Sequence, residues 1–323
     1  MDLNERNRHI NEMLNNNPNP DMFGLWSLIY ELMFSDCICL LDKRNQFVYL
    51  DDLTDPELSF LNGSGQKVSG INDELILPIF TDIDALSQTI DVFECEDDDF
   101  DLVRLDIIQF ANLLENSSLT GFLLNLTMHD FLIPPQFMAQ VVNKFLPIFT
   151  AEDSILFPVD GVELKGIYDS TNNDSLVNFI RTSFNGQNID ELLNEISKSF
   201  LSTIVYYEGE KIDVSEGVIG VNGFVNPITN DFGGIDCNIV FTNKDSLEIT
   251  LEDIDNHNIY AQLLRFDTFV RYALEQGTDG IVLMDSNGAI LLPRNELVNN
   301  FAKIYEMTKN PNLDNAVSFI FEK

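Results

Sequence analysis

The sequence predicts an α/β protein built from two tandem copies of one mixed-sheet domain with flanking helices. Short runs of strand formers alternate with amphipathic segments along the whole chain, as in α/β domains. A long stretch at 102–138 has a similar counterpart at 263–297. Upstream of it, IFTDIDAL at 79–86 recurs as VFTNKDSL at 240–247, so the similarity extends over most of each predicted domain.

The two stretches align through shared residues at nearly constant spacing. The matched residues are Arg104 with Arg265, Asp106 with Asp267, Gly121 with Gly280, and Pro134 with Pro293. The offset is 161 at the arginines (265 − 104) and 159 at the prolines (293 − 134). We attribute the difference to a shorter intervening helix in the second copy. The predicted domains are residues 1–150 and 174–323, joined by a connection at 151–173.

In the first copy, helices and strands follow from apolar periodicity and from capping residues. Aspartates stand before three of the expected helices, where a carboxylate can accept backbone N–H bonds; they are Asp21, Asp82 and Asp106. We expect helices over 1–14, 22–34, 83–90 and 107–115 and from Pro134, and strands over 37–42, 46–51, 74–80, 102–105, 121–126 and 130–133.

The second copy repeats this order after two opening helices. We expect helices over 176–184, 189–201 and 268–276 and from Pro293, and strands over 202–209, 237–241, 260–267, 280–285, 289–292 and 317–321. Long glycine-containing loops are expected at the same place in both copies, at 52–73 and 214–235. Loops on a rigid scaffold often carry binding functions, so these two are candidate binding surfaces.

The charge of the protein restricts its partners. Lys and Arg number 18 against 53 Asp and Glu, which gives a formal net charge of −35. This charge disfavours nucleic acid and anionic membrane surfaces and favours a basic protein or cations, although solubility alone also explains it. The charged N-terminus has no apolar signal core, and no apolar run is long enough to span a membrane. We therefore expect a cytoplasmic protein whose ligand is a protein or a small molecule.

The residues that usually carry catalysis or bind metals are sparse or badly spaced. The four cysteines, Cys37, Cys39, Cys95 and Cys237, lack zinc-ligand spacing and are expected to be free thiols. Three histidines stand beside no nucleophile, and no glycine-rich phosphate loop or calcium loop occurs. The acidic run at 94–101 is typical of a solvated loop. We expect no cofactor, no metal site and no catalytic residue.

Two Arg-x-Asp pairs are the best candidate binding residues. They are Arg104 with Asp106 and Arg265 with Asp267, and within a strand each pair would point to one side. In one interpretation the aspartate caps the next helix and the arginine steadies its carboxylate. In the other, each arginine holds an anionic ligand.

The order of these motifs resembles the N-terminal domain of the SseB family, the enhanced serine sensitivity proteins. The resemblance is carried by LPIFTD at 77–82 and by LLNLTMHDFLIPPQFM at 123–138, with second copies at 239–243 and 282–297. The usual Asn-Pro of the family is missing from both copies. The resemblance implies an α/β domain without an assigned enzymatic activity, and it supplies no catalytic residues.

We therefore expect a non-enzymatic binding, adaptor or regulatory protein with an unidentified partner. Two alternatives remain open from the sequence. One is an enzyme with a carboxylate and arginine site between the two repeats, and the other is a structural subunit of a larger assembly. Oligomeric state is not predicted.

Overall fold

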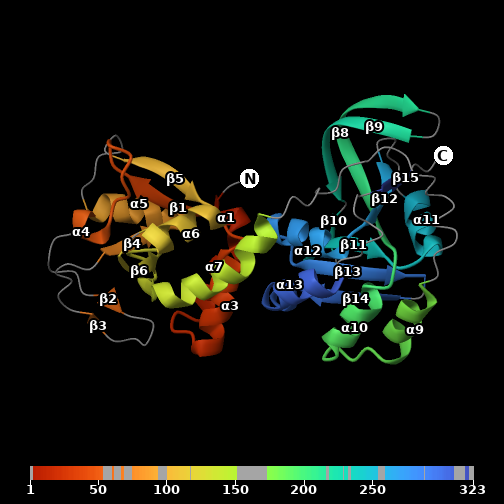
Figure 1. Cartoon of the computed structure of the whole chain (residues 1–323), viewed down its shortest axis with the longest axis horizontal. Coiled ribbons are helices and arrows are strands. Elements are labelled where there is room, and N and C mark those ends of the chain that lie inside the picture. The colour runs from red at the N-terminus through yellow and green to blue at the C-terminus, as the bar shows by residue number, and fades with distance from the viewer. Residues whose placement is uncertain are drawn as a thin grey trace. The chain divides into compact units, whose positions relative to one another are not determined.

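A computed structural model describes residues 3–53, 60–61, 67–68, 75–93, 100–116, 118–150, 173–215, 218–227, 229–231, 234–253, 259–286, 288–308 and 317–319. The chain divides into two compact units, Met1–Ala151 and Glu152–Lys323 (Figure 1). Both combine helices with mixed sheets, so the protein is of the α/β class as predicted. Most of the predicted connection and the acidic residues 94–99 lie outside the described residues.

Unit 1 starts with helices that precede its first strand. Its helices are α1 (Leu3–Arg6), α2 (Arg8–Asn16), α3 (Met22–Leu32), α4 (Leu50–Leu53), α5 (Ile83–Val92), α6 (Ile107–Asn116) and α7 (Pro135–Phe149). Its strands are β1 (Cys37–Leu41), β2 (Phe60–Leu61), β3 (Lys67–Val68), β4 (Leu75–Ile79), β5 (Asp101–Leu105), β6 (Leu119–Leu124) and β7 (Phe131–Ile133).

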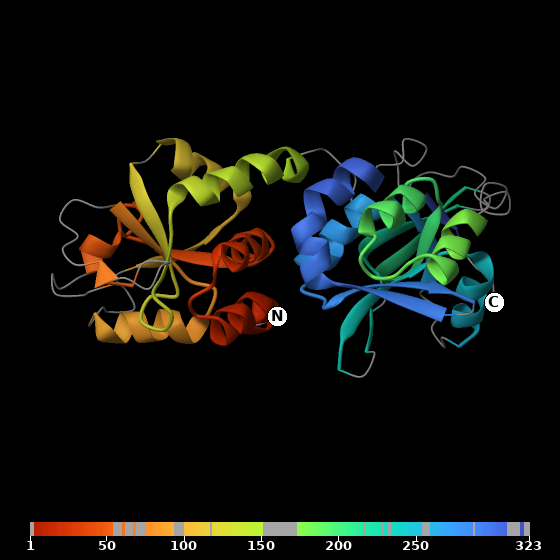
Figure 2. The ribbon, with the colours of Figure 1, turned by 90° about the horizontal axis from the view of Figure 1, so that it is seen from below.

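The main sheet of unit 1 is mixed. β4 and β6 are parallel, β7 is antiparallel to β6, and β5 is antiparallel to β1. An isolated bridge between Ile38 and Phe80 joins the β1–β5 pair to the other three strands, in the spatial order β5-β1-β4-β6-β7. Helices α6 and α7 lie on one side of these strands and α5 on the other (Figure 2).

Local sequence explains where several helices of unit 1 begin. Asp21 and Asp82 precede α3 and α5, and their carboxylates accept hydrogen bonds from first-turn N–H groups, as predicted. The predicted apolar face of α7 is confirmed, because Met138, Val141 and Phe145 are buried. The helix starts one residue later than expected, with Pro134 as its N-cap and Pro135 as its first residue.

Unit 2 also opens with two helices. Its helices are α9 (Asp174–Thr182), α10 (Ile189–Ile196), α11 (Lys244–Asp253), α12 (Phe266–Glu275) and α13 (Arg294–Thr308). Its strands are β8 (Leu201–Ser215), β9 (Val218–Pro227), β10 (Thr229–Asp231), β11 (Asp236–Phe241), β12 (Ile259–Leu264), β13 (Gly280–Asp285), β14 (Gly288–Pro293) and β15 (Val317–Phe319). No helix in the described part of either unit is long and apolar enough to cross a membrane.

The sheet of unit 2 runs in the order β14-β13-β11-β8-β12-β15. β11 and β13 are parallel, and the other neighbours are antiparallel. β9 pairs along β8, and β10 pairs with β11. The predicted loop at 214–235 is therefore largely wrong, because most of it forms strands β9 and β10. The other predicted loop, at 52–73, lies mostly outside the described residues.

The two units share an order of elements and a pattern of strand pairing. The β1–β5 pair of unit 1 corresponds to β8–β12, and β4–β6–β7 corresponds to β11–β13–β14. Gly121 pairs with Ile76 just as Gly280 pairs with Cys237. This agreement is what a tandem copy requires, and the duplication itself stays a prediction.

The element boundaries correct the alignment of the Arg-x-Asp pairs. The offset is 161 between the starts of α5 and α11 (244 − 83) and 159 between those of α6 and α12 (266 − 107). Helices α6 and α12 both have 10 residues, so the change in offset falls before β5, not in a shortened helix. Arg104 therefore corresponds to Leu263 and Asp106 to Arg265, and Arg104 does not lie over Arg265.

A second correction concerns the segment after β1. The predicted strand at 46–51 is reduced to an isolated bridge between Phe47 and Leu41, and residues 50–53 form α4. Asp42 explains the tight turn, because one of its carboxylate oxygens accepts hydrogen bonds from the N–H groups of Arg44 and Gln46.

Candidate functional site

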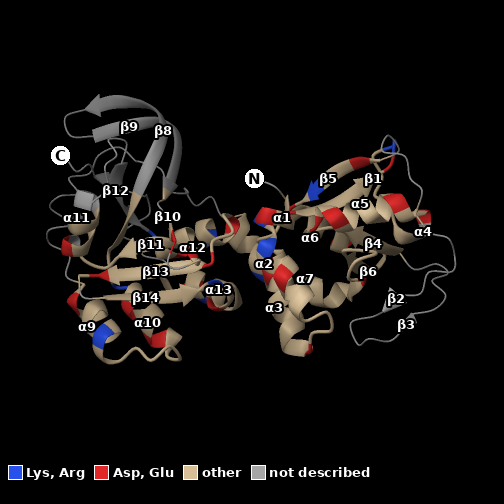
Figure 3. Ribbon diagram, turned by 180° about the vertical axis from the view of Figure 1, so that it is seen from behind, with Lys and Arg blue, Asp and Glu red and all other residues tan. Residues whose placement is uncertain are grey.

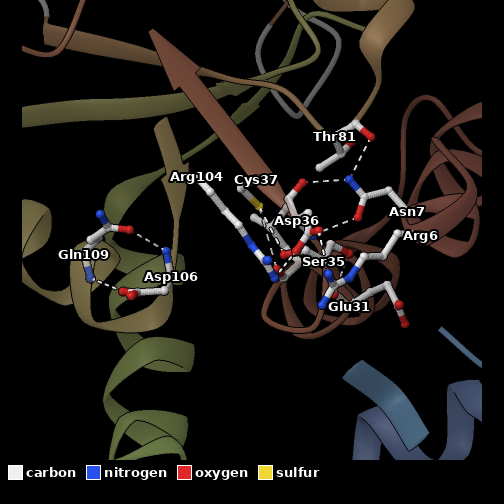
Figure 4. A network of polar contacts seen from close by, with 11 residues as sticks. Arg6, Asn7, Glu31, Ser35, Asp36, Cys37, Thr81, Arg104, Asp106 and Gln109 are labelled. Atoms are coloured by element: carbon white, nitrogen blue, oxygen red, sulfur yellow. Dashed lines mark hydrogen bonds and ion pairs between the residues drawn. The ribbon is translucent and has the colours of Figure 1, made fainter. Parts of the chain in front are cut away.

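Asp106 belongs to the start of helix α6. Its carboxylate accepts a hydrogen bond from the N–H of Gln109 at 2.8 Å, and the Gln109 side chain accepts one from the N–H of Asp106 at 2.7 Å (Figure 4). This reciprocal pair is a capping box. The predicted capping role of Asp106 is confirmed, but its carboxylate is not held by Arg104.

Arg104 contacts a different carboxylate, that of Asp36. The guanidinium of Arg104 approaches one carboxylate oxygen of Asp36, and Arg6 lies 3.2 Å from the other (Figure 4). The Asp36 side chain is 12% exposed, whereas that of Arg104 is 57% exposed. Strand β5, helix α1 and the residue before β1 thus contribute to one ion-pair cluster, Arg6–Asp36–Arg104. No local pattern predicts this cluster, because Asp36 stands far from Arg104 in the chain.

Asn7 holds Asp36 in place. Its side-chain amide donates to the carbonyls of Asp36 and Thr81, at 2.7 and 2.9 Å, and accepts from the N–H of Asp36 at 2.7 Å. Asn7 is buried and is also the N-cap residue of α2. One side chain therefore ties the first helices to the start of β1 and to the end of β4.

Asn173 makes the same three bonds in unit 2. Its amide donates to the carbonyls of Phe200 and Thr242, at 2.6 and 2.8 Å, and accepts from the N–H of Phe200 at 3.0 Å. Asn173 is likewise the N-cap residue of α9. We call Asn7 and Asn173 the clamp asparagines. Neither asparagine stands out in the sequence, because the helices that they precede share little sequence.

Unit 1 has a further buried network where the parallel strands β4 and β6 end. Thr81 donates its N–H to Asn125 and its hydroxyl to Asn11, and the Asn125 amide donates back to the Thr81 hydroxyl. Asn125, Thr127 and Asp130 have positive φ angles of 49°, 73° and 50°. In unit 2 the N–H of Thr242, the counterpart of Thr81, donates instead to the backbone carbonyl of Met284.

Arg265 and Asp267 form a buried ion pair. Arg265 is the N-cap residue of α12, and Asp267 lies in its first turn. Their closest atoms are 2.7 Å apart, and the side chains are 7% and 0% exposed. The arginine does steady the carboxylate, as one interpretation held, but this aspartate is not the cap residue. Burial to this degree closes the pair to an anionic ligand.

Two other arginines in unit 2, which were not among the predicted site residues, hold elements together. Arg294, the first residue of α13, donates to the carbonyls of Thr278 and Leu274 at 3.1 and 2.9 Å. A cation there complements the C-terminal end of α12. Arg181 of α9 makes two bonds of 3.1 Å to the carboxylate of Asp285 at the end of β13.

The thiols of Cys37, Cys39 and Cys237 are free and buried, and Cys95 lies outside the described residues. Burial raises the pKa of the Cys39 thiol to about 12 and is the main cause that raises that of Cys237 to about 11. Burial, with smaller effects of Asp36 and Cys39, also raises the pKa of Cys37 strongly. These thiols are protonated at neutral pH and are poor nucleophiles. Within the described ranges, no group of three His, Cys, Asp or Glu side chains is placed to hold a metal ion.

Comparison with known proteins adds little to this geometry. No family model matches the chain, and a search of curated proteins found no match. A solved structure described as "Anabaena Tic22 (protein transport)" matches with 12% sequence identity, over 80% of this chain and 92% of its own. The TM-score of that match is 0.19, at which the similarity carries no argument about fold or function.

Proposed function

We propose that the protein is a non-enzymatic binding or adaptor protein of the SseB-like type that acts in the cytoplasm. The observation that supports this proposal is that most of the predicted binding residues have structural roles. Asp106 caps α6, and Arg265 and Asp267 neutralise each other in a buried pair. These contacts stabilise the fold, and the Arg265–Asp267 pair is too deeply buried to meet a substrate. Arg104 and Asp106 are exposed.

The surface of the protein offers contacts of another kind. Several large apolar side chains are exposed in the described residues: Met22, Phe23, Val92, Leu102, Ile108, Met128, Ile249 and Leu291. Phe23 is 74% exposed. Acidic residues are spread over both units, and basic residues are sparse (Figure 3). Apolar anchors within a strongly acidic surface favour a basic protein as the partner.

The test is capture of the partner by the full-length protein from its native cell, compared with capture by Arg104→Gln and Arg271→Gln. Arg271 serves as the control because its ion pair with Glu275 lies within α12 of unit 2 and does not involve Arg104. We expect a protein to be retained in stoichiometric amount by the wild type and by Arg271→Gln. Conversion of a small molecule by the purified protein, lost in Arg104→Gln, would contradict the proposal and favour an enzyme.

A further inference from the structure

Strand β5 (Asp101–Leu105) is the outermost strand on its side of the unit 1 sheet. It pairs with β1 along one edge, and no strand in the described part of unit 1 pairs with its other edge (Figure 1). An open edge carries backbone N–H and C=O groups that can pair with another chain. Natural proteins usually protect such edges. The backbone and side-chain groups that β5 presents at its open edge therefore indicate what could bind there.

The register identifies which backbone groups of β5 point outward. Ile38 and Phe80 exchange two backbone hydrogen bonds, at 2.7 and 2.8 Å, so the backbone polar groups of Ile38 point to β4. In an antiparallel pair, bonding alternates along the strands. Arg104 and Leu102, which face Ile38 and Leu40, therefore direct their N–H and C=O groups away from β1.

Unit 2 fills the corresponding edge with a strand of its own. β15 (Val317–Phe319) pairs antiparallel with β12, placing Phe319 opposite Ala261 and Val317 opposite Leu263. At the offset of 159, Ala261 and Leu263 correspond to Leu102 and Arg104. Ala261 and Leu263, two of the three β12 residues that pair with β15, thus correspond to the two residues of β5 whose backbone groups point outward.

The side chains and flanking sequence of β5 suggest what could occupy this edge. Leu102 is 55% exposed, an unusual state for a large apolar residue on an edge strand. Five acids, Glu94 and Glu96 to Asp99, precede the strand, and Asp101 begins it. An antiparallel partner would carry its C-terminal end past Asp101, at the end of β5 that these acids precede in the chain, and basic residues would be favoured there.

We propose that β5 accepts an extended segment of a partner protein as an added antiparallel strand. The segment has two apolar residues separated by one residue, opposite Leu102 and Arg104, and is followed by Lys or Arg. Its backbone bonds with the outward groups of β5, and its basic tail follows past Asp101 and offsets the negative charge of the protein. This inference deepens the proposed binding function and rests on it.

A second copy of this chain is a poorer occupant than a basic segment. Pairing β5 with β5 of another copy would bring together two chains that each carry a formal charge of −35. Repulsion between them opposes association at physiological salt, where it is only partly screened. Self-association is therefore an outcome that would overturn the proposal.

The experiment titrates the full-length protein with a probe peptide. The probe is acetylated, copies residues 317–319 as its Val-Ser-Phe core, and ends in three lysines. We expect saturable binding that weakens with added salt, together with slowed amide hydrogen exchange at Leu102 and Arg104 measured by NMR. A peptide of equal charge with proline in place of the valine, whose N–H would face Arg104, should bind at least about tenfold more weakly, since proline cannot donate to the ladder.

Variants of the protein test whether the probe binds at the open edge of β5. Leu102→Pro removes an outward N–H and should weaken probe binding roughly tenfold. Leu102→Asp tests the same edge if the proline variant does not fold. Phe23→Ala, an exposed apolar control in α3, should bind like the wild type. Equal binding by every variant, protection at Ala261 and Leu263 instead, or concentration-dependent self-association would each overturn the inference.

The same variants separate this inference from the proposed function. If Leu102→Asp captures the native partner as well as the wild type does, the protein binds through another surface and the edge inference alone fails. If neither protein retains a stoichiometric partner, the binding function fails as well.

Discussion

At the scale of single residues, the Arg265–Asp267 pair gives the largest expected effect on stability. Asp267→Asn would leave the buried guanidinium of Arg265 without its counter-charge, and breaking a buried pair in this way costs about 3–5 kcal/mol. Arg271→Gln breaks the more exposed pair with Glu275 and should cost less than about 1 kcal/mol. Denaturant unfolding followed by circular dichroism measures both. Similar losses in the two variants would contradict this account.

The buried thiols should make stability depend on alkaline pH. The pKa values of Cys39 and Cys237, about 12 and 11 in the folded protein, exceed the ordinary thiol value of 9.0. Unfolding above pH 9 therefore releases protons. The stability that the neutral buried thiols confer is complete below pH 9 and is lost as the pH rises through the folded values.

We expect the free energy of unfolding to fall above pH 9, and to fall less steeply in Cys39→Ala. We also expect the thiols of Cys37, Cys39 and Cys237 to resist Ellman's reagent in the native protein and to react fully after unfolding. Rapid reaction of Cys39 in the native state would show that this side chain is not protected as described.

At the scale of elements, Gly121 in β6 and Gly280 at the start of β13 face the hairpin strand beside them. A Cβ at Gly280 would collide with the backbone carbonyl of Leu292. At Gly121 it would lie 2.6 Å from the end of the Leu132 side chain, which can move. We therefore expect Gly280→Ala to cost about 1–3 kcal/mol and Gly121→Ala to cost less. Gly288→Ala meets no atom within 4 Å and is the control in the same melting experiment.

How far the elements could be predicted depends on how local their causes are. The capping roles of Asp82 and Asp106 were predictable because each carboxylate bonds within three residues of itself. The ion pair of Arg104 with Asp36 was not, because it depends on the pairing of β5 with β1. The segment 214–235 is rich in glycine and looks like a loop, yet it pairs along β8 as a hairpin.

Matching identical residues also produced an incorrect alignment of the two units at the Arg-x-Asp pairs. Arg-x-Asp occurs in both, but strand register places the second pair two residues later relative to its helix. The clamp asparagines, in contrast, are structurally equivalent, because they make the same three bonds in both units. Their bonds join segments distant in the chain, so no local pattern reveals them.

At the scale of the whole molecule, the clamp asparagines allow a test of whether the units unfold separately. Asn7→Ala removes the bonds to the buried N–H and carbonyl of Asp36, while the Thr81 carbonyl keeps its bond from Asn11, and the change should cost about 2–3 kcal/mol. Asn173→Ala should do the same in unit 2. In calorimetry, each variant should shift one part of the melting transition and leave the other in place. The exposed Asn15→Ala, also in α2, is the control. A uniform shift of the whole transition in both variants would show that the units unfold together.

The single bridge between Ile38 and Phe80 has a mechanical consequence. Unit 2 repeats it, because Ser202 and Phe241 form the one register pair between β8 and β11 in the described residues. Each sheet is thus two leaflets joined along a narrow backbone seam. In unit 1 the seam is supported by the apolar packing of Leu40, Ile76, Phe80 and Leu123. Such packing lacks the directionality of a hydrogen-bonded ladder and weakens on cooling. A pulling force applied across the strands should therefore part the leaflets at this line before it separates the paired strands within either one.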